Sequence, residues 1–250
     1  MAFEKLFIMR LSFFLGLASL ALVYAKDKEG GAQTVDTGSF AVLRNGRRVA
    51  TEKFTVQKNA NGSSTVTSQL QADAGADSAS QNSELKLSSG GDLLRYEWHD
   101  TAPGKADLVV MPNDQFLIER VTMSGMTKPA EQPFLMPSST MILDNNFFVQ
   151  REILAWRYLA SSCKQEGGKT LCPKEPAQFG VLVPQERISM KVTLEPVGVE
   201  KISINGTERP LLRLNLKDDS GDWALWLDDQ NMFKLMRVLV IGDNTEVIRD

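Results

Sequence analysis

The residues best suited to chemistry by type and spacing are two aspartates in short turn-like motifs. Asp36 opens an Asp-Thr-Gly-Ser sequence, the signature of aspartic proteases, and Asp219 opens a second motif, Asp-Ser-Gly. Two such carboxyl groups that share one proton can activate a water molecule, because like charges so close cannot both ionise. The surroundings disfavour this chemistry, since only Val35 gives the first motif an apolar lead-in and the chain is short for two protease lobes.

Turn chemistry accounts for both motifs, because strand entries and hairpin turns favour Asp, Ser and Gly. We expect Asp36 to lie in a flexible segment before the first strand and Asp219 on a late hairpin tip, so that the two do not meet. An aspartic protease that uses Asp36 and Asp219 is therefore a remote alternative. The substitution Asp36→Asn is expected to cost little stability.

Other residues that could hold a metal or act as acids and bases form no recognisable motif. The aspartates between residues 218 and 229 lack the spacing of an EF-hand loop, and a solvated turn is the favoured interpretation. The single histidine, His99, alternates with apolar Trp98 and is expected to face solvent. The chain has no Gly-x-Ser-x-Gly, phosphate loop, Rossmann fingerprint or His-Glu-x-x-His motif. We therefore predict no enzyme, no metal and no cofactor.

The two cysteines, Cys163 and Cys172, stand close together in the sequence SSCKQEGGKTLCP. A zinc site needs four ligands, and the only histidine is far away in the sequence. In an oxidising compartment the better interpretation is a local disulfide that closes a short loop.

Aromatic side chains are the candidates for ligand binding. Phe147, Trp156, Trp223 and Trp226 are predicted to line an apolar cavity, although aromatic residues also fill ordinary protein cores. Trp226 alternates with Trp223, so the two side chains belong to opposite faces of one strand. We expect one of these faces to be less buried, or to be covered by something.

Period-two alternation dominates the chain from Ser39 onward and predicts antiparallel strands with one dry face. One example places Leu94, Tyr96 and Trp98 on the same face. Pairs such as Asn61-Gly62 and Asn205-Gly206 predict hairpin turns, so that neighbouring strands form a meander of about ten strands. The Pro-rich stretch of residues 128–137 is expected to be the crossover to a helix.

One helix is predicted over about residues 146–162, capped by Asp144 or Asn145. It is apolar around most of its girth and is therefore expected to be buried. The sequence predicts a mainly β fold: a strongly curved antiparallel β-meander, or half-barrel, wrapped around this one buried helix.

The N-terminus locates the protein. Residues 1–25 combine Lys5 and Arg10 with an apolar run and a small residue at Ala25, which predicts a secretory signal peptide, with an uncleaved N-terminal membrane anchor as the alternative. A flexible lead is expected over residues 26–38 and a single β-rich domain over residues 39–250. The whole chain has 28 basic and 31 acidic side chains, and residues 1–25 contain two of the basic ones, Lys5 and Arg10, and one of the acidic ones, Glu4. Residues 26–250 therefore have 26 basic and 30 acidic side chains, a net charge of −4. This balance argues against nucleic acid as a partner, and no stable membrane span is expected after cleavage.

The pattern of strands and helix resembles the periplasmic half-barrel proteins, which include lipoprotein carriers of the LolA/LolB type and related uncharacterised secreted bacterial families. The resemblance rests on the opening FAVLRNGRRVAT (residues 40–51) and on the late WALWLD segment (residues 223–228). It implies an apolar cavity between sheet and helix. No site residue is carried over, and the lid arginine of LolA-type carriers has no counterpart that we can place.

These observations predict a non-enzymatic periplasmic or secreted protein that binds a lipid, an acyl chain or another apolar ligand between sheet and helix. The alternative is an envelope scaffold or protein-interaction module without a ligand, whose partner would be another envelope protein.

Overall fold

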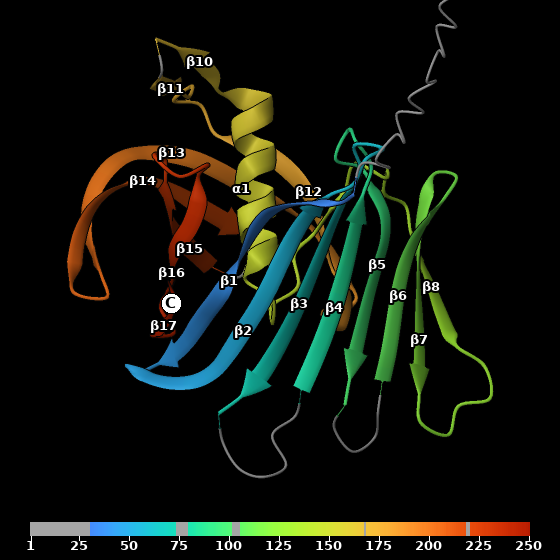
Figure 1. Cartoon of the computed structure of the whole chain (residues 1–250). Helices are drawn as coiled ribbons and strands as arrows, with labels where there is room; N and C mark the ends of the chain where they lie inside the picture. The colour runs from blue at the N-terminus through green and yellow to red at the C-terminus, as the bar shows by residue number, and fades with distance from the viewer. Residues whose placement is uncertain (1–30, 74–79, 102–105, 168, 219–220) are drawn as a thin grey trace, which may run out of the picture.

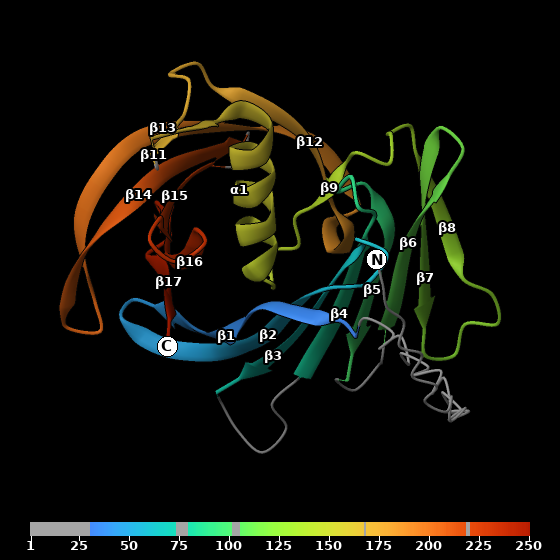
Figure 2. The same ribbon diagram turned by 45° about the horizontal axis from the view of Figure 1, so that its top comes forward.

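The computed structural model describes residues 31–73, 80–101, 106–167, 169–218 and 221–250. Most of the described strands form one large sheet that curls around a single long helix (Figures 1 and 2). The architecture confirms the prediction of a mainly β protein with a strongly curved antiparallel sheet and one buried helix. The predicted signal peptide and residues 26–30 of the predicted lead lie outside the described residues.

The first half of the chain forms a meander of eight strands in which each strand pairs with the next. The strands are β1 (Gln33–Arg44), β2 (Arg47–Lys58), β3 (Ser64–Ala72), β4 (Ser80–Leu87), β5 (Leu93–Asp100), β6 (Ala106–Asn113), β7 (Phe116–Met123) and β8 (Ala130–Phe134). Strand β8 ends one edge of the sheet and lies within the Pro-rich stretch predicted as the crossover. That prediction is wrong for residues 130–134, because Pro133 is tolerated on an edge strand.

The second half begins with the short strand β9 and the helix, and then forms another meander. Its elements are β9 (Met141–Ile142), α1 (Val149–Ser162), β10 (Lys164–Glu166), β11 (Lys169–Leu171), β12 (Ala177–Val183), the 3₁₀ turn η1 (Pro184–Glu186), β13 (Ile188–Ile204), β14 (Thr207–Asp218), β15 (Gly221–Asp228), β16 (Lys234–Ile241) and β17 (Thr245–Arg249). Strands β10 and β11 form a separate hairpin, and the predicted disulfide between Cys163 and Cys172 is present at its base.

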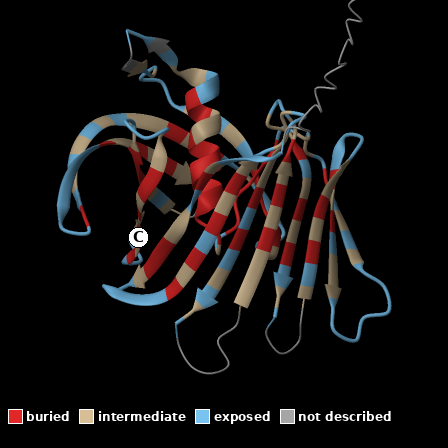
Figure 3. Ribbon diagram, in the orientation of Figure 1, coloured by how far each residue is buried: buried red, intermediate tan, exposed pale blue. Residues whose placement is uncertain are grey.

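The two meanders join in the middle of the sheet, where β17 at the end of the chain pairs antiparallel with β1. The sheet order is β8-β7-β6-β5-β4-β3-β2-β1-β17-β16-β15-β14-β13-β12-β9. In a single meander, in which each strand pairs only with its neighbours in sequence, β1 would lie at an edge of the sheet. Because β1 lies between β2 and β17, the structure corrects the prediction of one continuous meander of about ten strands. The core lies between α1 and the inner face of the curled sheet (Figure 3).

Alternation predicts most inward-facing side chains, and exceptions coincide with irregular pairing. In β2, for example, the buried residues follow one another at two-residue intervals, and they are Ala50, Glu52, Phe54 and Val56. In β5 the expected face of Leu94, Tyr96 and Trp98 is wrong at Leu94, which is 49% exposed while Leu93 is buried. A register shift between Lys86 and Leu87 on the neighbouring strand accounts for the change, since an extra residue reverses the alternation.

The start of the domain also differs from the prediction. Strand β1 begins at Gln33, and Asp36 is a buried residue paired opposite Val56. The predicted flexible lead over residues 26–38 is therefore wrong for residues 33–38. Asp36 lacks the exposed turn position that the sequence motif favoured.

The helix starts at Val149, three residues later than predicted, and neither Asp144 nor Asn145 caps it. Glu52 of β2 takes this role from across the core. Its carboxylate accepts hydrogen bonds from the backbone N–H groups of Phe148 (2.6 Å) and Val149 (3.3 Å). A buried acceptor at this end satisfies donors that the helix cannot pair internally and complements the positive end of its dipole.

Candidate functional site

The main groove, a hollow of about 330 Å³, lies between α1 and the part of the sheet where β1 begins. Its walls are largely apolar. We define it by Ile153, Trp156, Arg157 and Ala160 of α1 and by Val35, Val56 and Leu87 of the sheet. The volume lies within the range of small-molecule sites, so the arrangement can hold an apolar chain against the helix.

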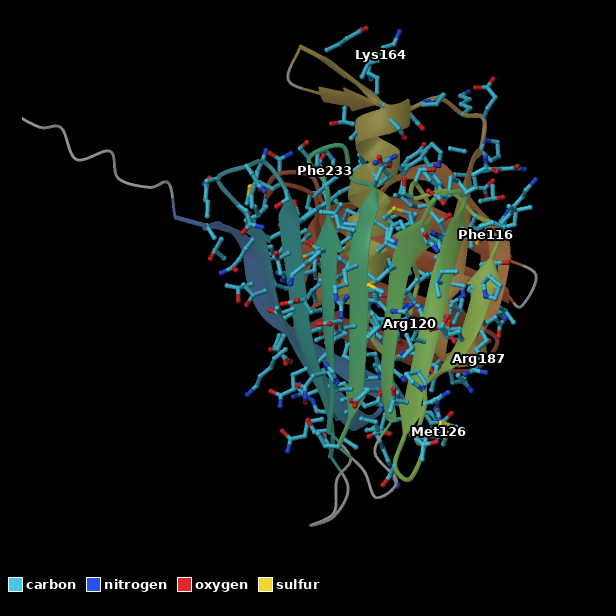
Figure 4. The ribbon with its side chains drawn as sticks, turned by 90° about the vertical axis from the view of Figure 1, so that its right-hand side faces the viewer. Phe116, Arg120, Met126, Lys164, Arg187 and Phe233 are labelled. Atoms are coloured by element: carbon cyan, nitrogen blue, oxygen red, sulfur yellow. A yellow bond between two sulfur atoms is a disulfide. The ribbon has the colours of Figure 1, made fainter. Side chains whose placement is uncertain are left out.

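Trp156 is the central side chain of this region, and a neighbouring turn holds it in place. Its indole Nε1 donates a hydrogen bond to the backbone oxygen of Phe233 at 2.9 Å. Both Met232 and Phe233 have positive φ angles, 53° and 54°, a conformation that costs energy for bulky residues. Figure 4 shows Phe233 near α1 at the end of the molecule that carries Lys164.

A second hollow, the side groove, lies on the other side of Trp156. It measures about 360 Å³ and is lined by Trp156, Leu159, Ala160, Cys163, Met232 and Phe233. Trp156 and Ala160 line both grooves, so the exposed end of α1 presents apolar surface on two sides. Of the four predicted ligand-binding residues, Trp156 is the one that lines these two grooves.

The other three predicted ligand-binding residues lie elsewhere. Phe147 is fully buried in the core. Trp223 lines a pocket of about 420 Å³ near the N-terminal end of α1, where the guanidinium of Arg151 lies 4.1 Å from the centre of a Trp223 ring. Trp226 is buried on the face of the sheet opposite to the face that carries Trp223. The structure therefore brings the four residues to no common site.

Trp226 belongs to a small apolar cluster that the long β13–β14 hairpin helps to form. The cluster contains Ile204, Leu211, Ala224, Trp226 and Met236. The guanidinium groups of Arg213 and Arg237 lie 5.5 Å and 5.1 Å from the ring of Trp226, and its Nε1 donates to Glu200. The expectation was that one face of the Trp223–Trp226 segment is less buried or is covered by something, and residues of the β13–β14 hairpin cover the face of Trp226.

Asp36 forms a buried ion pair in which two cations compensate its charge. Arg249 Nη2 lies 2.5 Å from one carboxylate oxygen, and Lys234 Nζ lies 3.1 Å from the other. Burial opposes ionisation, but the hydrogen bond from Arg249 and the neighbouring charges hold the pKa of Asp36 below its usual value. Its predicted protease partner, Asp219, lies outside the described residues. The contacts of Asp36 tie β1 to β16 and β17, which is a structural role.

Sequence reasoning missed the one acid, Glu152, and the arginine, Arg151, that α1 carries into the core. Glu152 is buried near Asp36, and both burial and the charge of Asp36 raise the pKa of Glu152 well above its usual value. Arg151 is also fully buried and donates to the backbone oxygen of Asp144 at 2.8 Å. The available signal was the polar run Gln150-Arg151-Glu152 at the start of a mostly apolar helix.

Asp144, the predicted cap, instead organises a buried hydrogen-bond network. Its carboxylate accepts hydrogen bonds from the Tyr96 hydroxyl, the Gln185 amide and the backbone N–H of Asn146. Burial raises the pKa of Asp144, although these donors oppose the shift. The network joins β5, the approach to α1 and η1, and so it positions the helix inside the sheet.

The remaining titratable candidates are on the surface. His99 Nδ1 lies 2.7 Å from Asp107 on the neighbouring strand, and both side chains are exposed, as expected for His99. The predicted aspartate-rich segment is split between the two ends of β15, with Asp222 at one end and Asp228 at the other. Within the described part of the chain, no group of three or more potential ligands is arranged to hold a metal ion.

Comparisons with known proteins give one structural likeness. No protein-family model matches the chain, and no curated protein matches it significantly. The chain is similar to the crystal structure of a β-barrel-like protein of a domain of unknown function, DUF1849, from Brucella abortus. The two share 8% identity with a TM-score of 0.47, over 87% of this chain and 97% of the other. The resemblance to LolA/LolB-type carriers has no counterpart in these matches and stays a prediction.

Proposed function

We propose that this chain is a non-enzymatic extracytoplasmic protein that binds an apolar ligand in the main groove. The observation that carries the proposal is the position of that groove, between α1 and the sheet, with apolar walls from both. A void of a few hundred Å³ at this position suits a ligand, whereas a close-packed interior would not.

Two observations support the proposed compartment, the periplasm or the secreted space. The bond between Cys163 and Cys172 suggests an oxidising environment. The leader in residues 1–25 has the pattern of a secretory signal. None of the described helices is long and apolar enough to cross a membrane.

The test is a titration of the purified, exported protein with a fluorescent dodecanoyl probe. We expect saturable binding that Ala160→Phe abolishes, because Ala160 is exposed on α1 and a phenyl ring there would fill the grooves that it lines. Ser161→Phe is the matched control, since Ser161 is the next exposed helix residue and lines neither groove. Absence of saturable binding, or equal binding by both variants, would contradict the proposal.

A second candidate function is a scaffold that engages another envelope protein through the β8 edge of the sheet. Strand β8 is the terminal strand of the sheet, and exposed apolar side chains surround it and β7. They include Phe116, Met123, Met126 and Leu135, of which Phe116 and Met126 are seen near opposite ends of β7 in Figure 4. Purification from the native envelope separates the candidates, because a carrier would retain lipid and a scaffold would retain protein.

A further inference from the structure

The rim of the main groove carries two cations, Lys58 and Arg157, and no acidic side chain is among the residues that line it. This local balance is opposite to that of the chain beyond its leader, which has an excess of acidic residues. Lys58 is the last residue of β2 and is exposed, and Arg157 is partly exposed on α1. Apolar walls with a positive rim have the complementary chemistry of an amphiphile with a negative head.

The turn between β4 and β5 holds Arg157 in position. Arg157 Nη1 donates a hydrogen bond to the backbone oxygen of Gly90, and a side chain on Gly91 would place its Cβ only 2.3 Å from that nitrogen. Gly91 also has a φ of 84°, which glycine adopts without strain. The turn therefore admits the guanidinium because residue 91 has no side chain.

These contacts leave much of the guanidinium available to a ligand. An arginine has five N–H donors, and its bond to Gly90 engages one. Its acidic neighbour, Asp92, is 3.9 Å from Nη2 and has a side chain 45% exposed, which makes this a weak surface pair. Two donors in a planar fork match the two oxygens of a carboxylate or a phosphate.

We infer that the ligand is a single-chain amphiphile with an anionic head, a carboxylate or a phosphate, which lies between Lys58 and Arg157 while its chain occupies the main groove. This inference rests on the proposed function and adds the chemical class of the ligand. The chain contributes binding by burying apolar surface, and the two cations discriminate the head group.

The experiment compares dodecanoate, dodecyl phosphate and dodecanol as competitors of the fluorescent probe at low salt. We expect the two anions to bind about tenfold more tightly than the alcohol, since hydrogen bonds to charged groups are stronger than those to neutral ones. Lys58→Gln and Arg157→Gln should each reduce this preference without abolishing the binding of dodecanol. Lys58 is exposed, so its variant tests the idea even where Arg157→Gln disturbs the turn.

Two controls separate the head-group site from general electrostatics. Lys164 is a cation at the same end of the molecule as Phe233 and lines neither groove (Figure 4). The variant Lys164→Gln should therefore leave the preference for the anionic competitors unchanged. Acetate and inorganic phosphate should not compete, because they lack the chain. If inorganic phosphate, which has no acyl chain, competed with the probe, the inference of an amphiphilic ligand would be wrong and the site would bind free anions. Equal binding of dodecanoate and dodecanol would overturn the anionic head and leave the proposed function standing, whereas no binding of any probe would overturn both.

Discussion

Buried charges distinguish this core from an ordinary apolar one. Asp36, Glu52, Glu119, Asp144, Arg151, Glu152 and Arg249 are all buried. Each must be paired or kept neutral, as the raised pKa of Glu152 favours, because an isolated charge in a protein interior is costly. Asp36 and Arg249 compensate each other across the seam where the beginning and the end of the chain meet, with Lys234 as a second partner. Their contacts give the aspartate of the Asp-Thr-Gly-Ser motif a structural role in the fold.

Asp36→Asn should therefore destabilise the protein strongly, in contrast to the small cost expected from the sequence. Removing one partner of a buried ion pair costs about 3–5 kcal/mol, because Arg249 then keeps only Glu152, 3.6 Å from its Nη1, as an acidic neighbour. Urea denaturation at pH 7 measures the change in the free energy of unfolding. Asp250→Asn is the control, because the exposed Asp250–Arg48 pair should contribute less than about 1 kcal/mol. Equal stability of the two variants would contradict the structural role of Asp36.

Among the elements, η1 and β7 are fastened together by one ion pair. Glu119 of β7 is fully buried, and one of its carboxylate oxygens lies 3.1 Å from Nε of Arg187, which follows η1. In Figure 4, Arg187 lies near the β7–β8 edge. Apart from Arg187, neither carboxylate oxygen of Glu119 has a hydrogen-bond partner within the described part of the chain, so Arg187 alone compensates the charge of Glu119. The contact holds the β6–β8 part of the sheet near the turn that follows β12.

This fastening predicts a pH dependence. Burial raises the pKa of Glu119 to about 7, although Arg187 opposes the shift. A carboxyl whose pKa is higher in the folded protein than in the unfolded chain stabilises the fold at low pH, and this stabilisation is lost as the pH rises from about 4.5 to about 7. Arg187→Gln should therefore destabilise the protein more at pH 8 than at pH 5, because at pH 8 it leaves a buried charge unpaired.

Urea denaturation at both pH values measures this difference. In a Glu119→Gln background, which cannot titrate, the cost of Arg187→Gln should be the same at pH 5 and pH 8. Buried Glu52 has a pKa raised to about 7 as well and adds a pH dependence of the same sign to every variant, so the comparison rests on differences between variants. A cost that stays pH-dependent without Glu119 would refute the assignment.

At the scale of the whole molecule, the last strand is the one that joins the two meanders. Strand β17 pairs with β1 on one side and β16 on the other, although β1 and β17 are at opposite ends of the domain. Contacts this distant in sequence carry a high entropic cost and form late or slowly. The two meanders can therefore join into one sheet only after β17 has been synthesised and has paired with β1 and β16.

Ending the chain at Asn244 should prevent cooperative folding, because the truncation exposes the edges of β1 and β16 and removes Arg249 from the core. The measurement is the loss of a sigmoidal urea transition followed by circular dichroism and tryptophan fluorescence. Removal of Asp250 alone is the control and should preserve the transition, since that residue makes exposed contacts. A truncated chain that unfolds cooperatively would show that β17 is dispensable.

Local patterns in the sequence determined the strands, the helix and the disulfide. The alternation that buries Phe54 and Val56 is visible in a few neighbouring residues of the sequence. Residues 149–159 are apolar around most of the helix surface, which predicts a buried helix whatever the helix packs against. Asn-Gly pairs predicted hairpins, and Asn205 and Gly206 have the positive φ angles that such turns need. The fold class could be predicted because each of these signals acts over a few residues.

Only the tertiary structure decided which distant residues meet. The pairing of β1 with β17, the capping of α1 by Glu52 and the ion pair of Asp36 with Arg249 all join segments far apart in the sequence. It also separated Trp156, at the main groove, from Phe147, Trp223 and Trp226. A single sequence displays the polarity of each position but not its partner, because the partner depends on how the whole sheet curls and closes around the helix.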